Sequence, residues 1–172
     1  MFDLLFTNPP FGSLIPIDDP TILSQYDLGH SWKNENGNLV MTNKIKTSVP
    51  PEILFIERCI QLLKPGGRMA IVLPDSILSN PGLKSVRNWI LKYTQIIACV
   101  DLPLETFQPF VGAKTNVVFL EKKTKDRIQN EEKSVNEKHY DIFMACDYKI
   151  GHDRRGNPSY IRNSLGEEIL IK

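Results

Sequence analysis

A chain of 172 residues is within the range of a single domain and is long enough to bury a hydrophobic core. Its formal net charge of +1 argues against a protein that binds polyanions over its whole surface, so any contact with nucleic acid must come from local patches. The sequence shows no signal peptide, lipidation motif or long apolar span, which predicts a cytoplasmic protein without membrane contact. Its three cysteines, Cys59, Cys99 and Cys146, are widely spaced, and we expect small buried apolar residues rather than metal ligands.

The first predicted element is a strand at residues 2–7, which are almost wholly apolar and therefore typical of a strand covered on both faces. Asn8-Pro9-Pro10-Phe11 follows directly. Each proline fixes its own φ and lacks an N–H, and Pro9 also biases Asn8 toward an extended conformation, so the strand ends in a rigid turn. This turn carries an amide, free carbonyls and an aromatic ring at the edge where ligands bind in open α/β sheets. A turn without function is the alternative, because Asn-Pro is also a common turn signal.

A long polar insert, residues 13–48, follows this turn and contains two prolines and two glycines. Loops of this length inside a domain are usually functional or disordered. Because the insert begins at the turn, we interpret it as a lid or a substrate-contacting loop, with disorder as the alternative. His30 and Trp32 are candidates for substrate contact, and the alternative is a local hydrophobic anchor for the loop.

The middle of the chain alternates helical and strand patterns. Residues 50–63 and 83–93 carry apolar side chains at helical spacing. Each segment precedes a predicted buried strand: an uninterrupted apolar run at 69–73, typical of a parallel strand, and a mostly apolar segment at 95–102. The segment 64–67, Lys-Pro-Gly-Gly, ends the first helix. A further strand begins at Thr115. This order predicts an α/β fold with a parallel sheet and flanking helices.

The C-terminal part is more polar. Residues 124–138 have mixed charges and almost no apolar side chain, which predicts a charged linker or a solvated helix face rather than a nucleic-acid contact. The extension 139–172 contains a short apolar segment and then the motif Gly-His-Asp-Arg-Arg-Gly at 151–156. Its basic side chains Lys149, His152, Arg154 and Arg155 suit phosphate contacts, and a solvated surface turn is the alternative.

Taken together, these segments resemble one family. The order strand–Asn-Pro-Pro-Phe, helix, Leu-Lys-Pro-Gly-Gly, strand, Leu-Pro, and a last Thr-led strand is similar to the N6-adenine DNA methyltransferases that use S-adenosylmethionine. The modification subunits of type I and related restriction systems are the most similar group. The match covers roughly residues 2–123 and continues in the 139–172 tail. The resemblance implies a partial Rossmann-like methyltransferase fold whose last strand is antiparallel.

The cofactor half of that fold is missing from the pattern. The family's S-adenosylmethionine site begins with a strand and a glycine-rich turn, and no such turn precedes Asn8. Gly66 and Gly67 follow a helix and precede a strand, so they form a helix-end turn instead. We therefore expect residues 1–123 to be the C-terminal half of the catalytic domain, with an incomplete cofactor site and no activity as an isolated chain.

The resemblance implies a catalytic set of Asn8, Pro9, Pro10 and Phe11. The Asn8 side-chain oxygen and the Pro9 carbonyl would accept hydrogen bonds from the adenine amino group, and Phe11 would stack on the base after it is flipped out of the duplex. Asp75, at the same sheet edge, is a candidate for shaping the base pocket, and Lys114 and Thr115 are weaker candidates.

The expected function is therefore methylation of adenine N6 in double-stranded DNA within a restriction-modification system, with specificity and restriction subunits as partners. Two alternatives are open. Asn-Pro-Pro-aromatic turns also occur in enzymes that methylate RNA adenine or protein glutamine, although these usually have Tyr at the aromatic position. A methylase-like remnant without catalysis, acting in DNA binding or assembly, is the other alternative.

Overall fold

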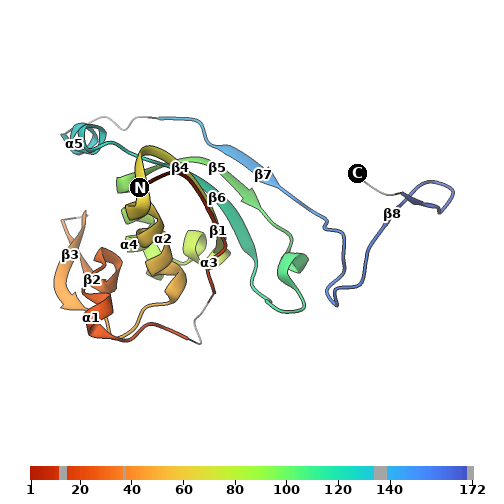
Figure 1. The fold of residues 1–172 in the computed structure, drawn as a ribbon, viewed down its shortest axis with the longest axis horizontal. Helices are drawn as coiled ribbons and strands as arrows, with labels where there is room; N and C mark the ends of the chain where they lie inside the picture. Colours follow the sequence, from red (N-terminus) through yellow and green to blue (C-terminus); the bar gives the residue numbers. More distant parts are fainter. Residues whose placement is uncertain (12–14, 37, 134–138, 170–172) are drawn as a thin grey trace.

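The computed structural model describes residues 1–11, 15–36, 38–133 and 139–169 (Figure 1). Gly12 and Ser13, which continue the predicted turn into the insert, lie outside them. The strands are β1 (Phe2–Thr7), β2 (His30–Glu35), β3 (Asn38–Ile45), β4 (Leu63–Pro74), β5 (Thr94–Asp101), β6 (Thr115–Lys122), β7 (Phe143–Cys146), β8 (Ile161–Arg162) and β9 (Glu168–Ile169). The helices are α1 (Pro20–Leu23), α2 (Pro51–Leu62), α3 (Asp75–Ser79), α4 (Lys84–Tyr93) and α5 (Lys125–Lys133), with short 3-10 turns η1 (Asp27–Gly29), η2 (Pro81–Leu83) and η3 (Leu104–Phe107).

The main sheet has the order β1-β4-β6-β5-β7. β1 pairs with β4 in parallel, and β5 pairs with β7 in parallel, whereas β6 lies antiparallel between β4 and β5. The expected antiparallel last strand of the 1–123 region is therefore confirmed, and the α/β fold class with it. Because β1, β4 and β5 point the same way, their C-terminal ends meet at one edge of the sheet.

Helices α2 and α4 cover one face of this sheet (Figure 1). Their apolar side chains interlock with alternate residues of β4, such as Met69, Ile71 and Leu73, to form one core cluster. Cys59 and Cys99 are buried in this cluster, as expected for small apolar residues, whereas Cys146 is exposed and the expectation is wrong for it. Residues 64–67, predicted as a helix-end turn, instead lie in the first part of β4, where its register with β1 shifts, and Gly66 there has a φ of +77°, a left-handed conformation that favours glycine.

On the other face of the sheet, the prediction that residues 2–7 are covered on both sides is wrong. Residues 2–7 do form a strand, but β1 lies at the edge of the sheet and is not covered on both faces. Phe2, Leu4 and Phe6 are 55%, 61% and 74% exposed, because no described helix packs over them. With Ile97, Phe119 and their neighbours, Leu4 and Phe6 line a shallow apolar hollow of about 220 Å³. An apolar run predicts that other residues pack over the strand, but it does not identify the segment that does so.

The insert is ordered through most of its length, so disorder is the wrong interpretation for its described residues. It folds as α1, η1 and the β2–β3 hairpin beside α2 (Figure 1). Glu57 of α2 holds η1 in place by accepting hydrogen bonds of 2.9 Å from the backbone N–H groups of both Asp27 and Leu28. The Trp89 indole of α4 donates to the Asp27 carboxylate at 2.9 Å. These contacts attach the insert to the helical layer.

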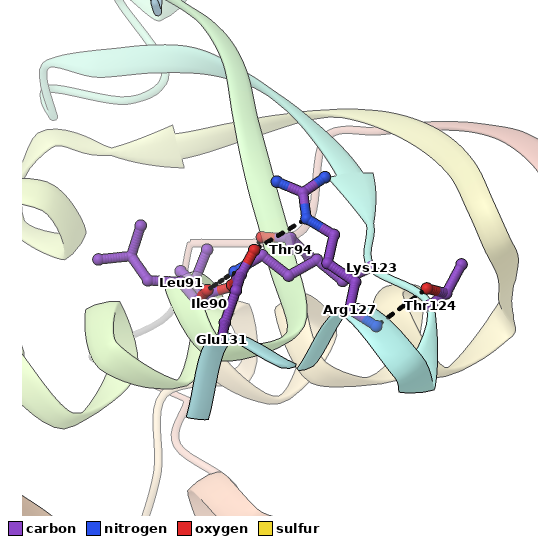
Figure 2. Close-up of polar contacts among 7 residues, drawn as sticks. All are labelled: Ile90, Leu91, Thr94, Lys123, Thr124, Arg127 and Glu131. Atoms are coloured by element: carbon purple, nitrogen blue, oxygen red, sulfur yellow. Dashed lines mark hydrogen bonds and ion pairs between the residues drawn. The ribbon is translucent and has the colours of Figure 1, made fainter. Parts of the chain in front are cut away.

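Helix α5 occupies most of the segment predicted as a charged linker or helix face, while 134–138 lie outside the described residues. Figure 2 shows how it is held. Lys123, whose side chain is only 8% exposed, donates to the Leu91 carbonyl of α4 at 2.7 Å and pairs with Glu131 of α5. Arg127 also pairs with Glu131, at 2.8 Å. A nearly buried ion pair therefore joins this polar helix to α4.

Candidate functional site

The Asn8-Pro9-Pro10-Phe11 turn follows β1 at the edge of the sheet where β4 also ends. The β1–β4 register pairs Thr7 with Ile71, so the turn leaves the sheet about level with the last residues of β4. Pro9 is buried, whereas Asn8 is exposed, and no hydrogen bond joins the Asn8 side chain to another described residue. The buried proline anchors a turn whose amide points to solvent with its hydrogen-bonding capacity free.

Phe11 makes an aromatic contact that connects the turn to η3. Its ring lies edge-to-face with Phe107, with centroids 6.2 Å apart and planes at 84°. Phe11 is half-buried, and the neighbouring Phe110 is 94% exposed. The sequence analysis did not identify Phe107 as a site residue. The available signal was an aromatic residue in the loop after a strand that ends at the same edge as Asn8.

A polar cluster lies at this edge beside the turn. Asp75 begins α3 directly after β4, and its carboxylate accepts a hydrogen bond of 3.3 Å from the Asn116 side-chain amide. Asn116 is only 4% exposed, and its oxygen faces the Cys99 thiol at 3.8 Å. Burial raises the pKa of Cys99, so this thiol stays protonated and acts as a donor. The buried Asn116 amide therefore helps to orient the Asp75 carboxylate.

Lys114 and Thr115, the weaker candidates, are held by their neighbours in different ways. Lys114 pairs with Asp101 at 2.8 Å, and this hydrogen bond raises the pKa of the lysine. Thr115 is fully buried, and its hydroxyl has no hydrogen-bond partner among the described residues. The second carboxylate oxygen of Asp101, Oδ1, is also buried and has no hydrogen-bond partner among the described residues. Two buried polar atoms near this edge therefore retain unused hydrogen-bonding capacity.

The predicted basic tail residues make different contacts from one another. Arg154 pairs with Glu105 of η3 at 3.1 Å, and this hydrogen bond lowers the pKa of Glu105. Arg155 is exposed, and its backbone N–H donates to Asp153. Lys149 and His152 instead line a cleft between the tail and η3. Arg154 therefore links the tail to η3, Arg155 is exposed to solvent, and Lys149 and His152 line the cleft.

Asp153 explains the fixed shape of this tail. Its carboxylate accepts hydrogen bonds from the backbone N–H of Arg155 at 2.8 Å and from the backbone N–H of Asn157 at 2.9 Å. The Asn157 side chain donates a third bond at 3.0 Å, and these bonds lower the pKa of Asp153. Gly156 completes the turn with a φ of +81°. The acidic and glycine positions of the 151–156 motif therefore build a turn.

The insert residues His30 and Trp32 do not lie in this site. The Trp32 indole donates to the Asp27 carbonyl at 3.2 Å, and the His30 ring contacts the Tyr26 carbonyl at 2.7 Å. Both therefore anchor the insert internally, which was the alternative interpretation. Within the described ranges, no helix is long and apolar enough to cross a membrane, and no three His, Cys, Asp or Glu side chains group as metal ligands would.

Comparison with known sequences identifies relatives over most of the chain. A family model described as N-6 DNA Methylase matches residues 1–144. The methylase subunit of the type I restriction enzyme EcoEI from Escherichia coli is 29% identical over 128 residues, which are 70% of this chain and 21% of that protein. The EcoKI methylase subunit from E. coli K12 is 33% identical over 126 residues, 70% of this chain and 19% of that protein.

Comparison with solved structures agrees on the fold. A structure described as a class I S-adenosylmethionine-dependent methyltransferase from Listeria monocytogenes matches 84% of this chain and 36% of its own, with a TM-score of 0.59 and 19% identity. A type I restriction enzyme modification subunit from Vibrio vulnificus matches 70% of this chain and 22% of its own, with a TM-score of 0.51 and 22% identity. The chain thus spans about a fifth of the length of the curated relatives that it matches.

Proposed function

Because the chain belongs to the N-6 DNA methylase family, we propose that its Asn8-Pro9-Pro10-Phe11 turn is the part of a methyltransferase that receives adenine and presents its N6 amino group for methylation. The observation that carries this proposal is the exposed, unpaired Asn8 amide on a proline-fixed turn at the carboxyl edge of the sheet, next to an aromatic contact. Open α/β sheets bind ligands at this edge.

The chemistry follows from the atoms of the turn. The adenine amino nitrogen is a poor nucleophile because its lone pair is conjugated with the ring. Two acceptors, the Asn8 side-chain oxygen and the Pro9 carbonyl, would take hydrogen bonds from the two amino hydrogens and direct the lone pair out of conjugation. Prolines hold both acceptors in place before the base arrives, so the gain comes from positioning and preorganised electrostatics. No strong base is needed, because the proton leaves after the nitrogen becomes cationic.

Phe11 and Phe107 supply the surface for the base itself. A base must leave the duplex to reach a turn of this kind, and stacking on an aromatic ring compensates for the lost base stacking. The two rings come from β1's turn and from η3, so they approach the same space from different parts of the fold. Asp75, oriented by Asn116, would line the side of that space.

The described residues fit only part of a cofactor site. S-adenosylmethionine supplies the methyl group in this family, and a glycine-rich strand-to-helix turn that would hold it is absent from residues 1–11, 15–36, 38–133 and 139–169. Two features support the packing of further polypeptide against this sheet. The outer edge of β1 has no strand beside it among the described residues, and the apolar face at Leu4 and Phe6 is open. We therefore assign cofactor binding to polypeptide that covers this face.

The relatives support a proposal for the partners. The curated relatives are methylase subunits of type I restriction enzymes, and we propose that this protein likewise acts on double-stranded DNA together with specificity and restriction subunits. The net charge of +1 is consistent with DNA binding that is shared among subunits, because a chain without a strong overall positive field depends on other subunits or on local patches for DNA affinity.

A substrate panel tests the proposal. The chain is expressed within its natural reading frame together with the subunits encoded beside it, and labelled S-adenosylmethionine is offered with duplex DNA, RNA or a glutamine-containing protein. We expect label in DNA only. Asn8→Ala should lower kcat by at least about 100-fold while leaving KM for DNA within a few-fold, since the amide acts on the reacting group.

Two results would contradict the proposal. Label in RNA or protein but not in DNA would establish one of the alternative substrates. Full activity of Asn8→Ala on DNA would remove the turn from the chemistry. Phe11→Tyr serves as the control, because it retains the stacking surface and should retain most of the activity.

A further inference from the structure

A cleft of about 880 Å³ between η3 and the C-terminal extension is separate from the Asn8 turn. Pro103 and Glu105 line one wall, and the opposite wall comes from the tail segment that contains Tyr148, Lys149 and Tyr160. Neither its volume nor its lining is explained by the methyl-transfer chemistry derived above.

The lining of the tail wall combines exposed aromatic rings with a free cation. Tyr148 is 84% exposed and Tyr160 is 48% exposed, which leaves two large rings facing solvent. No described residue pairs with the ammonium group of Lys149. Aromatic platforms beside cations in an open groove are the arrangement with which proteins bind single-stranded nucleic acid, because bases stack on the rings and phosphates meet the cations.

Three contacts join the tail to η3, to β5 and to the loop after η3. Arg154 pairs with Glu105 at 3.1 Å, and the backbone N–H of Asp147 donates to the Asp101 carbonyl at 2.9 Å. At Gly156, an added Cβ would lie 3.4 Å from Pro109, so the turn packs closely against the loop after η3. The pairing with Arg154 also neutralises Glu105, the acidic side chain that would otherwise repel phosphate in this cleft.

The same 3-10 turn connects the cleft to the proposed adenine site. Glu105 lies on the cleft wall, and Phe107, two residues further along η3, contacts Phe11. A DNA strand whose flipped adenine reaches Phe11 would therefore pass close to η3. Flipping one base also disturbs its neighbours, and an aromatic, cationic groove next to the base site would stabilise them.

We propose that this cleft binds the DNA strand next to the flipped adenine, with Tyr148 and Tyr160 stacking on neighbouring bases and Lys149 contacting a phosphate. The proposal rests on the adenine-methylation function proposed above, and it adds a separate binding site to it. Strand binding at the cleft needs neither the Asn8 amide nor cofactor.

Binding is measured by fluorescence anisotropy with the full 172-residue chain and a labelled single-stranded DNA 12-mer, at several salt concentrations and without cofactor. We expect Tyr148→Ala and Tyr160→Ala each to weaken binding by about 5- to 140-fold, which corresponds to the loss of one stacked base. Lys149→Ala should reduce the slope of log K against log salt by about 0.7, the value for one phosphate contact on a single strand.

Matched variants separate the cleft from general effects. Tyr148→Phe retains the ring and should bind as the unmodified chain does. Lys84→Ala removes the same charge from an exposed position at the start of α4, outside the cleft lining, and should leave the salt slope unchanged. Because Tyr148 and Lys149 are outside the core cluster, equal urea midpoints are expected for all variants and would exclude unfolding as the cause.

The proposal is overturned if the chain does not bind the 12-mer at 50 mM salt, or if Tyr148→Ala and Tyr160→Ala bind as tightly as Tyr148→Phe. Binding of an RNA 12-mer at least about tenfold tighter than DNA would overturn the assignment to DNA. These outcomes are independent of the methylation panel. Weakened strand binding in the tyrosine variants combined with no methylation of DNA would support the cleft and refute the proposed function.

Discussion

Glu57 provides the sharpest test of how the insert is attached to the helical layer. Its carboxylate is 1% exposed and accepts hydrogen bonds from Asp27, Leu28 and the Gln61 side chain, at 2.9, 2.9 and 3.0 Å. Glu57→Ala leaves two backbone N–H groups without their acceptor. A buried donor without a partner costs about 1–3 kcal/mol, and the Leu28 N–H is the more deeply buried of the two. We therefore expect the free energy of unfolding to fall by about 2–4 kcal/mol.

Glu57→Gln should cost less, about 1–3 kcal/mol, because the amide oxygen still accepts one of the two backbone bonds while its NH₂ faces the other donor. The assay is urea unfolding followed by tryptophan fluorescence. The chain has two tryptophans, and both indoles donate to Asp27, so the signal reports on this region directly.

The matched control is Glu35→Gln, which removes a carboxylate from the same insert at an exposed ion pair with Lys33. Surface pairs of this kind are worth about 0–1 kcal/mol. A loss below about 0.5 kcal/mol for Glu57→Ala, or a loss equal to that of Glu35→Gln, would refute the reasoning that this carboxylate holds the insert in place.

The pH dependence of the same comparison has a defined sign. Burial raises the pKa of Glu57, so the folded chain binds a proton at this group more readily than the unfolded chain does. Its contribution to stability is therefore fully present below the unfolded pKa and is lost as the pH rises through the folded pKa. We expect the stability deficit of Glu57→Gln relative to the unmodified chain to be larger at pH 5 than at pH 7.5. A deficit that grows toward high pH would contradict this assignment.

Three further predictions concern the base site, the open sheet face and α5. Phe107→Ala should lower kcat/KM for DNA methylation by about 5- to 140-fold, measured in the labelled-methyl assay, and an unchanged value would remove Phe107 from the base site. Leu4→Ser and Phe6→Ser should each change the free energy of unfolding of the isolated chain by less than about 0.5 kcal/mol in urea, because both side chains are already exposed, whereas Ile56→Ala in the core should cost about 2–5 kcal/mol. Comparable losses for all three would mean that the open face is covered in solution. Lys123→Ala should increase amide hydrogen exchange throughout α5, because it removes the buried side of the ion pair in Figure 2, and unchanged protection would show that α5 is held by other contacts.

The elements with clear periodicity were predictable from sequence. α2 and α4 lie within a residue of the predicted helices, because apolar spacing and the flanking prolines and glycines determine both their faces and their ends. The strands β4, β5 and β6 were also identified, because mostly apolar runs are typical of sheet strands, although β4 begins at Leu63 and includes residues 64–67, which were predicted as a turn.

The insert was less predictable, because its stability comes from distant residues. No local pattern in residues 13–48 shows that Glu57, about thirty positions further along the chain, will accept the Asp27 and Leu28 N–H groups. The prediction that β1 is covered on both faces was wrong for a related reason. Its apolar side chains correctly indicate that the strand needs a partner surface, but composition does not show whether the described chain provides it.

The candidate site was predicted in part. The position of the Asn8 turn at the carboxyl edge follows from a strand followed by two prolines. The contact between Phe11 and Phe107 depends on the long-range pairing of β4, β5 and β6, which sequence periodicity does not fix. The basic tail residues were grouped by proximity in sequence, whereas the turn built around Asp153 directs Arg154 to Glu105 and leaves Lys149 in the cleft.

The central claim is that the Asn8 amide presents the adenine amino group for methylation. The most direct test is nucleoside mass spectrometry of duplex DNA after incubation with S-adenosylmethionine and the protein expressed in its natural reading frame with its neighbouring subunits. We expect N6-methyladenine as the product with the unmodified protein, and at least about 100-fold less of it with Asn8→Ala. Methylation at cytosine, or N6-methyladenine formed equally well by Asn8→Ala, would contradict it.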